Sequence, residues 1–253
     1  MGPDLSVILP TLNEHDALVV IHAALLDAIA PYRAEIIVVD DASTDGTIPL
    51  VERWSKIEPF RLIVRTRHRG LGSAVVEGLA VARGRAIVVM DADGSHEPKS
   101  IAALAEPVLA GRAEFVLGSR HVPGGSLPGM KSGRRAISWG AALLARPLTD
   151  VRDPMSGFFA VAKPILGRAA LAPIGYKIGL EILVKCRPSP RYEVPIDFRP
   201  RVAGKSKLGG VQFAGYVRHL ARLYRWKIFG GRGRRDRAPQ EEPPTGPPRE
   251  AAG

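Results

Sequence analysis

Short, nearly continuous apolar runs alternate with longer stretches of helical periodicity through the first half of the chain. Runs of Val, Ile and Leu predict strands that are covered on both faces of a sheet. We expect strands at 5–9, 35–39, 61–64, 86–90 and 115–117, and helices at 15–29, 48–56, 71–83 and 99–110. This alternation predicts an α/β fold, a mostly parallel sheet with right-handed crossover helices.

The second half of the chain has a less regular pattern. It predicts helices at 131–145, 180–185 and 211–229, and extended segments at 158–162 and 192–198. Residues 230–253 are rich in Pro, Gly and charged residues, which is typical of a disordered tail. We therefore divide the chain into an α/β domain at 1–210, a docking helix at 211–229 and a tail at 230–253.

The predicted helix at 211–229 is amphipathic. Its apolar residues recur at spacings that place them along one helix face. The stripe consists of Phe213, Val217, Leu220, Tyr224 and Ile228, with Arg218, Arg222 and Arg225 beside it. A basic amphipathic helix suits an anionic lipid surface, so we expect it to hold the protein on a membrane. The same stripe would also suit packing on the protein's own core, or docking to a small membrane-spanning subunit.

The charge of the chain changes this picture by indicating a polyanionic partner. The formal net charge is +11, and seven Lys or Arg occur between 200 and 229 without any Asp or Glu. Nucleic acid is not the expected partner, because only 6% of the residues are aromatic and single-strand binding relies on aromatic stacking. No apolar stretch reaches the roughly 20 residues that span a bilayer, and no secretory signal is recognisable. The protein is therefore expected to be soluble or peripheral, with an anionic membrane or phosphorylated substrates as partners, although a solvated basic face would share this pattern.

Polar clusters follow the predicted strands, where ligands bind in parallel sheets. Asp91 and Asp93 come directly after the strand at 86–90. Alternate residues of an extended segment project to one side, so the two carboxylates can converge on one cation. Mg²⁺ and Mn²⁺ prefer such oxygen ligands and bridge them to substrate phosphates. A solvated acidic turn is the alternative for this pair.

Other residues extend the candidate site. Asp41 also ends a strand, where its carboxylate could accept hydrogen bonds from a base or a ribose. Arg134 and Ser138 lie four residues apart and share one face of a predicted helix. Together with Arg120 and the basic loop from 201 to 207, they would suit two separate anions. The chain has no Walker motif, zinc-ligand spacing or nucleophile elbow.

The order of these motifs resembles a known family. PTLNE at 10–14, VDDASTDGT at 39–47 and DAD at 91–93 are similar to the family 2 glycosyltransferases of GT-A (Rossmann-like) fold. Further motifs narrow the resemblance to the dolichyl-phosphate (polyprenol-phosphate) mannosyltransferases: GLGSA at 70–74, DADGSHEP at 91–98, GSR at 118–120, DPMSGF at 153–158, EVPI at 193–196 and RVAGKSKL at 201–208. The resemblance covers about residues 5–210.

The resemblance implies a role for each matching position. The donor nucleotide sugar would be bound by Pro10, Leu12, Glu14, Val39, Asp41, Asp91, Ala92, Asp93, Arg120, Arg201 and Lys207. Asp91, Asp93 and Arg120 would be catalytic, with Asp91 and Asp93 holding Mg²⁺ or Mn²⁺. Ser95 is a candidate third metal ligand, although some members have Gln there. The acceptor phosphate would meet Arg120, Arg134 and Ser138.

The reaction implied is inverting transfer of a hexose, mannose from GDP-mannose, onto dolichyl or polyprenyl phosphate. The protein would lie on the cytoplasmic face of a membrane. Other members of the family transfer glucose or other sugars from UDP-sugars, so the donor is left open. A sugar nucleotidyltransferase would need a Gly- and Lys-rich amino-terminal motif that residues 10–14 lack, and a basic nucleic-acid-binding module is the alternative of another class.

Overall fold

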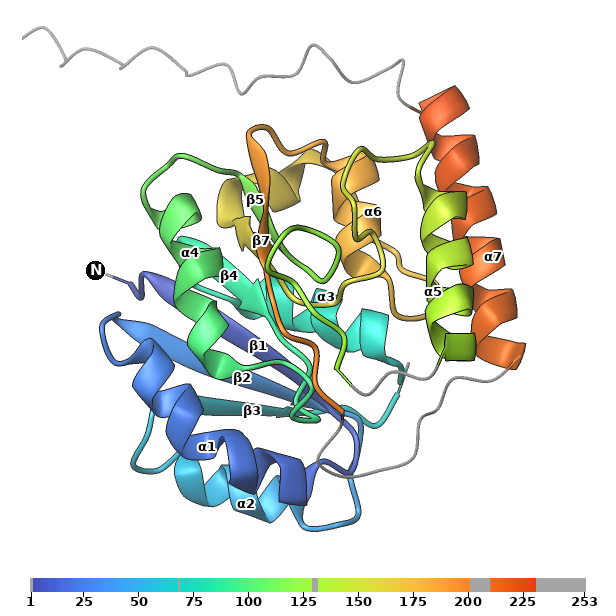
Figure 1. Ribbon diagram of the computed structural model, residues 1–253. Coiled ribbons are helices and arrows are strands. Elements are labelled where there is room, and N and C mark those ends of the chain that lie inside the picture. Colours follow the sequence, from blue (N-terminus) through green and yellow to red (C-terminus); the bar gives the residue numbers. More distant parts are fainter. Residues whose placement is uncertain (1, 68, 129–131, 201–209, 231–253) are drawn as a thin grey trace, which may run out of the picture.

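The computed structural model describes residues 2–67, 69–128, 132–200 and 210–230, and of residues 132–138 and 210–213 it describes only the backbone. A seven-stranded sheet runs through this part, in the order β3-β2-β1-β4-β6-β5-β7 (Figure 1). The strands are β1 (Leu5–Thr11), β2 (Ala34–Asp40), β3 (Phe60–Val64), β4 (Ala86–Val89), β5 (Phe115–Ser119), β6 (Phe159–Ala162) and β7 (Arg191–Pro195). The predicted α/β class, with a mostly parallel sheet flanked by helices, is confirmed.

One strand reverses direction, which the apolar pattern did not reveal. β6 is antiparallel to both of its neighbours, with Phe159 opposite Val89 of β4 and opposite Leu117 of β5. The other strand pairs are parallel. Because β6 is reversed, its first residue lies at the edge where β4 and β5 end. The segment 153–158 that leads into β6 therefore reaches the same edge as the acidic and basic motifs.

Helices cover both faces of the sheet. Alternation along β1 sends Val7 and Leu9 to one face and Ile8 to the other. The first face packs on α1 (His15–Ile29), α2 (Thr47–Trp54) and α4 (Ile101–Leu109). The second packs on α3 (Leu71–Val81) and α6 (Ile178–Lys185). Two 3₁₀ turns, Pro98–Ser100 and Lys163–Arg168, join these elements.

Two further helices form a third layer beside α6. α5 (Ser132–Ala145) and α7 (Gly210–Arg225), which continues into a π-helical turn (Trp226–Gly230), lie side by side (Figure 1). The Tyr216 hydroxyl donates to the Ala141 carbonyl at 2.7 Å, and the Tyr224 hydroxyl donates to the Leu144 carbonyl at 2.7 Å. In the part of the chain that the structure describes, no helix is long and apolar enough to cross a membrane.

The face of α7 that is buried differs from the predicted stripe. Leu220 is buried together with Tyr216, His219 and Leu223, while Val217 is 45% exposed. The prediction of a single apolar stripe facing lipid or a subunit is therefore wrong at Leu220, because that side chain packs into the core shared with α5 and α6. Packing on the protein's own core, one of the two alternatives given for this helix, describes this part of α7. The side chain of Phe213 lies outside the part of the chain that the structure describes, and so does the predicted tail at 230–253 apart from Gly230.

A buried ionic cluster joins α7 to α6. Glu181 is fully buried, and its carboxylate lies 2.5 Å from Lys185 Nζ, 3.3 Å from His219 Nε2 and 3.5 Å from Arg222 Nη2. Burial alone would raise the pKa of Glu181, but the contacts with His219, Lys185 and the Ala172 N–H outweigh it and lower the pKa to about 2. The carboxylate is therefore ionised at neutral pH and holds α7 by charge as well as by apolar packing.

Candidate active site

The ends of β1 and β2 bring the first predicted donor-binding residues together. Pro10 lies opposite Val39 in the parallel register of these strands. Leu12 and Glu14 follow Pro10 in the turn that leads into α1. The Val39 side chain is fully buried in the core, so only its backbone can face a ligand at this edge. The structure thus places these four predicted positions along one edge of the sheet.

The turns that follow β1 and β2 are tied to each other. Fully buried Asp40 accepts hydrogen bonds from the Thr11 hydroxyl at 2.7 Å, the Ser43 N–H at 2.7 Å and the Ser43 hydroxyl at 2.6 Å. Asn13, which has a positive φ of 58°, accepts from the Thr44 N–H through its side-chain oxygen at 2.8 Å. Asp40 therefore stabilises the turn, whereas the carboxylate of its neighbour Asp41 contacts Arg65 and the Gly70 N–H instead.

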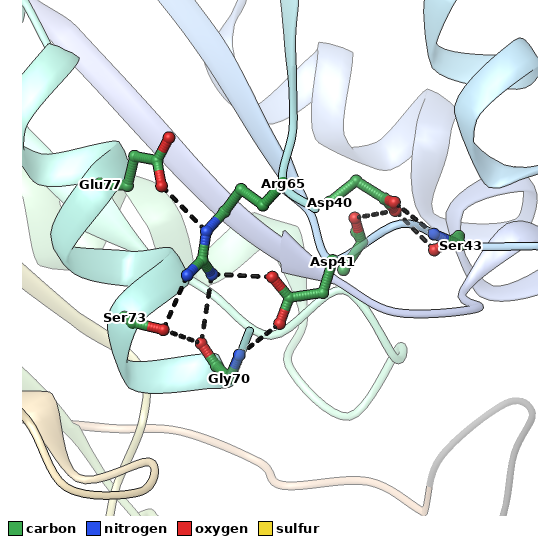
Figure 2. Close-up of polar contacts among 8 residues, drawn as sticks. Asp40, Asp41, Ser43, Arg65, Gly70, Ser73 and Glu77 are labelled. Carbon is green, nitrogen blue, oxygen red and sulfur yellow. Dashed lines mark hydrogen bonds and ion pairs between the residues drawn. The ribbon is translucent and has the colours of Figure 1, made fainter. Parts of the chain in front are cut away.

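Asp41 belongs to a buried network that the sequence did not reveal (Figure 2). Its Oδ1 accepts from Arg65 Nη1 at 2.7 Å, and its Oδ2 accepts from the Gly70 N–H at 2.6 Å. Arg65 Nη2 also donates to the Ser73 hydroxyl at 2.8 Å, and Arg65 Nε lies 2.9 Å from Glu77 Oε2. A carboxylate can accept about four hydrogen bonds, so Asp41 keeps acceptor capacity for a ligand. Arg65 and the turn at Gly70 fix its orientation.

The acidic motif after β4 forms a tight, mostly buried loop. Asp93 is buried, and its Oδ1 accepts from the Ser95 N–H at 3.0 Å. The Ser95 hydroxyl is buried and has no hydrogen-bond partner among the described residues. A Cβ on Gly157 would lie 3.5 Å from the Asp91 carboxylate, so a side chain at position 157 would contact that group. Among the described residues no three His, Cys, Asp or Glu side chains converge, so a cation here would be held by Asp91, Asp93 and oxygen atoms of other kinds. Two carboxylates beside an unsatisfied hydroxyl fit a hard divalent cation.

His96, which was not among the predicted site residues, supports this loop. Its Nδ1 accepts a hydrogen bond from the Asp91 N–H at 3.2 Å, so the neutral ring carries its proton on Nε2. The ring stacks on Phe158, with 4.8 Å between centroids, and meets Phe198 edge-on. Burial lowers the pKa of His96, and the charges of Asp91 and Asp93 oppose this only in part. A neutral His96 therefore positions the backbone of Asp91.

Arg120 is held by a second long-range ion pair. Its side-chain Nε and Nη2 donate to the two carboxylate oxygens of Asp153 at 2.6 Å and 2.7 Å. The backbone N–H of Arg120 donates to the same carboxylate at 3.0 Å. Burial alone would raise the pKa of fully buried Asp153, but the hydrogen bonds and charge of Arg120 lower it. The guanidinium lies 5.3 Å from the centre of the Phe198 ring. Arg120 is thus a fixed cation at the end of β5.

Lys177 is a further cation that sequence reasoning missed. It precedes α6, and its Nζ donates to the Met155 carbonyl in the segment that leads into β6. Burial and the nearby charge of Arg120 lower the pKa of Lys177 to about 8, while Asp91 and Asp153 act in the opposite direction. The pKa of Lys177 therefore responds to the charges of Asp91, Arg120 and Asp153. No motif surrounds Lys177 in the sequence, and its hydrogen bond to the segment before β6 is what ties it to this edge of the sheet.

Four of the predicted site residues cannot be compared with this geometry. Arg134 and Ser138 lie on α5, but their side chains are outside the description, and so are Arg201 and Lys207 entirely. The described chain does approach the acidic loop just before Arg201, because the Arg199 N–H donates to the Ser95 carbonyl at 3.0 Å. Their roles stay predictions.

Comparison with solved structures identifies the fold class. Glucosyl-3-phosphoglycerate synthase from Mycobacterium tuberculosis, solved with Mn²⁺, UDP and glucosyl-3-phosphoglycerate, superposes with a TM-score of 0.64 at 23% sequence identity. The match covers 89% of this chain and 80% of that one. The architecture is therefore that of a GT-A-like glycosyltransferase, with the polar residues described above at the ends of its strands.

The chain belongs to glycosyl transferase family 2, whose model matches residues 6–169. It is 39% identical to a dolichol-phosphate mannosyltransferase from Saccharomyces cerevisiae, with 90% of each chain covered. It is 40% identical to a dolichol-phosphate mannosyltransferase from Pyrococcus furiosus over 88% of this chain. The chain spans only 64% of the length of the Pyrococcus protein. The resemblance stated from the motifs is confirmed at the level of the family and of these relatives.

Proposed function

We propose that this protein transfers mannose from GDP-mannose onto dolichyl or polyprenyl phosphate, with inversion at the anomeric carbon. The proposal rests on one observation. The acidic loop after β4 and fixed cations lie at the same edge of the sheet, in a chain of glycosyl transferase family 2. Asp91 and Asp93 lie there with Arg120 and Lys177. The names of relatives that are 39–40% identical over most of this chain support mannose and dolichyl phosphate as substrates.

In the proposed reaction an oxygen of the lipid phosphate attacks the anomeric carbon, and the bond from that carbon to the nucleoside diphosphate breaks. A phosphate monoester is already ionised near neutral pH, so the step needs no strong general base. Asp91 and Asp93 would hold Mg²⁺ or Mn²⁺, which would neutralise charge on the departing diphosphate. The presence of Mn²⁺ with UDP in the Mycobacterium tuberculosis enzyme supports this use of a divalent cation.

The remaining task of the protein is to bring two anions together. Arg120 is held in place by Asp153, so it need not reorganise when an anion binds. Lys177 adds a second positive charge near Asp91. Fixed cations of this kind lower the repulsion between the donor diphosphate and the acceptor phosphate, which is positioning and electrostatic catalysis.

A donor screen tests the proposal most directly. Purified protein would be incubated with a polyprenyl phosphate, Mg²⁺ or Mn²⁺, and labelled GDP-mannose, UDP-glucose or UDP-N-acetylglucosamine. We expect label in the lipid fraction from GDP-mannose only, and none after chelation of the metal. Transfer from a UDP-sugar in preference to GDP-mannose would refute mannose as the substrate while leaving the family unaffected.

Arg65 is expected to govern donor affinity by orienting Asp41. In Arg65→Gln the carboxylate loses a charge-assisted hydrogen bond, and we expect the donor KM to rise about tenfold with little change in the acceptor KM. Glu77→Gln is the control, because Glu77 approaches Arg65 at Nε, whereas Asp41 is bound through Nη1, and Glu77 is 45% exposed. Steady-state titration of both substrates decides. A folded Arg65→Gln variant with a normal donor KM would contradict donor binding by Asp41.

Arg134 and Ser138 are expected to act on the acceptor. They lie four residues apart on α5, outside the half of the sheet that carries Pro10 and Asp41. For Arg134→Ala we expect the KM for polyprenyl phosphate to rise about tenfold, and less for Ser138→Ala, with the donor KM unchanged. Arg53→Ala on α2 is a charge-matched control. A selective rise in donor KM would assign these residues to the other substrate.

We further propose that the protein works as a peripheral protein on the cytoplasmic face of a membrane, where a polyprenyl phosphate acceptor would reside. A small integral membrane subunit that binds α7 belongs to the same proposal. Among the stripe residues whose side chains the structure describes, Val217 and Ile228 stay exposed, at 45% and 59%. They are the positions through which such a contact would be made.

A further inference from the structure

The loop that leads into α6, residues 169–177, is fastened to the fold on two sides. In its first half, the Ala172 N–H donates a hydrogen bond to the buried carboxylate of Glu181 on α6, at 3.0 Å. In its second half, the Gly175 carbonyl accepts a hydrogen bond from the Gly72 N–H, also at 3.0 Å. Gly72 belongs to the first turn of α3. The loop therefore connects the start of α3 to α6.

The contact at Gly72 leaves no room for a side chain. A Cβ at this position would overlap the Gly175 carbonyl oxygen and would lie 2.9 Å from the Cβ of Pro173. Non-bonded carbon atoms pack at about 3.5–4.0 Å, and a backbone carbonyl cannot swing aside as the end of a side chain can. Glycine at position 72 therefore allows the backbone of α3 to approach the loop closely.

The same turn of α3 holds the candidate donor-binding residue Asp41 (Figure 2). The Gly70 N–H donates to Asp41 Oδ2 at 2.6 Å, and the Gly70 carbonyl accepts from the Ser73 hydroxyl at 2.8 Å. Gly72 lies between Gly70 and Ser73, within this turn. A displacement of the turn would therefore disturb its contact with Asp41 and its contact with Gly175 together.

The loop ends at Lys177, which contacts the segment before β6. Lys177 follows Gly175 by two residues, a span of about 7 Å at most, so a shift of Gly175 is passed on to it. Lys177 Nζ donates to the Met155 carbonyl in that segment. The segment also contains Gly157, where a Cβ would lie 3.5 Å from the Asp91 carboxylate. The loop thus holds the Lys177 ammonium against a segment that adjoins the acidic loop.

We propose that Gly72 is a positioning residue, whose contact with Gly175 couples the turn that holds Asp41 to the loop that places Lys177. A donor nucleotide bound at Asp41 stabilises the turn, and the turn in turn stabilises the loop with Lys177 in place. This role rests on the proposed function, in which Asp41 binds the donor and Lys177 lowers the repulsion between phosphates. Cations that are fixed before the reaction need no reorganisation during it.

A double-mutant cycle between Gly72 and Lys177 tests the coupling. We expect Gly72→Ala and Lys177→Gln each to lower kcat/KM for sugar transfer about tenfold, and the double variant to lie about tenfold below wild type as well. Independent sites would multiply the two losses to about a hundredfold. Pro173→Gly loosens the loop without creating a clash at Gly72. It should lower kcat/KM less, and its effect should also be non-additive with that of Lys177→Gln.

Gly167→Ala is the matched control, because Gly167 lies in the 3₁₀ turn before the loop and a Cβ there would meet no atom within 4 Å. It should keep the wild-type rate, and it should not alter the effect of Lys177→Gln. Thermal unfolding midpoints show which variants are folded. Multiplied losses in Gly72→Ala/Lys177→Gln would overturn the coupling, and so would multiplied losses in Pro173→Gly/Lys177→Gln if Gly72→Ala does not fold.

The same cycle measured on the Kd for GDP in the presence of Mn²⁺ does not depend on sugar transfer. We expect non-additive losses of affinity there too, and additive losses would contradict the coupling. Wild-type protein that binds GDP but transfers no sugar from any donor in the screen would refute the proposed function instead. The two proposals therefore fail in different measurements.

Discussion

Replacing Asp93 by alanine is expected to lower kcat/KM for sugar transfer by about a thousandfold, the effect of losing several kcal/mol of transition-state stabilisation. Asp93 is buried two residues after Asp91, and its Oδ1 already orders the loop by accepting from the Ser95 N–H. Removal of one of two carboxylates should weaken the cation and leave the diphosphate charge unneutralised. Transfer rates measured against metal concentration provide the test.

Asp16→Ala is the control for this variant, because Asp16 lies on α1 and is 81% exposed. It should retain the wild-type rate. The thermal unfolding midpoint of Asp93→Ala should be measured as well, so that loss of activity is not confused with loss of fold. Near-normal turnover with an unchanged dependence on metal would show that the acidic loop is not the metal site.

Asp153→Asn is expected to be the most destabilising of the conservative substitutions at the site, by about 3 kcal/mol. The carboxylate is fully buried, and its removal leaves the buried charge of Arg120 without a counterion. Transfer should fall too, because Arg120 would lose the contact that orients it. Urea unfolding at neutral pH measures the first effect, and kcat/KM measures the second.

The pH dependence of stability gives an independent check on Asp153. Its pKa is lowered in the folded protein, so the ion pair contributes fully above the pKa of an unfolded Asp, about 3.9. The contribution is lost as the pH falls below that value through the lowered pKa. Wild-type protein should therefore lose stability more steeply in acid than Asp153→Asn does.

Asp150→Asn is a closely matched control. Asp150 also makes a paired contact with an arginine, Arg191, but its side chain is 68% exposed. Solvent screens such a pair, so its loss should cost less than about 1 kcal/mol. If the two substitutions lowered the free energy of unfolding equally, burial would not make the Arg120–Asp153 ion pair more important for stability than an exposed pair.

Much of the sheet could be predicted from the sequence, because apolar runs and helical periodicity are local properties of the chain. The strand predicted at 35–39 is observed as Ala34–Asp40, and the helix predicted at 15–29 is α1 with the same bounds. The acidic motif could be predicted for a similar reason, since its two carboxylates are adjacent in sequence to a strand end. The prediction that this motif binds a divalent cation together with the donor nucleotide sugar relied on the family resemblance as well.

The reversed strand and the support of the site could not be predicted in this way. The run at 158–162 indicates a buried strand, but periodicity carries no information about direction. The partners of the site residues are distant in sequence: 24 residues separate Arg65 from Asp41, and 33 separate Arg120 from Asp153. Each partner alone looks like an ordinary surface charge, and only the fold shows that the pair is buried.

The amphipathic helix α7 illustrates the same division. The sequence by itself determined that 211–229 is helical, basic and apolar on one side, because those are consequences of spacing and composition. Only the tertiary structure decided which side is covered, since that depends on α5 and α6 packing against Tyr216, Leu220 and Leu223. In the same way, sequence determined which carboxylates and cations the chain possesses. Their charges acquire defined partners only where the strand ends and the reversed β6 bring them together out of water.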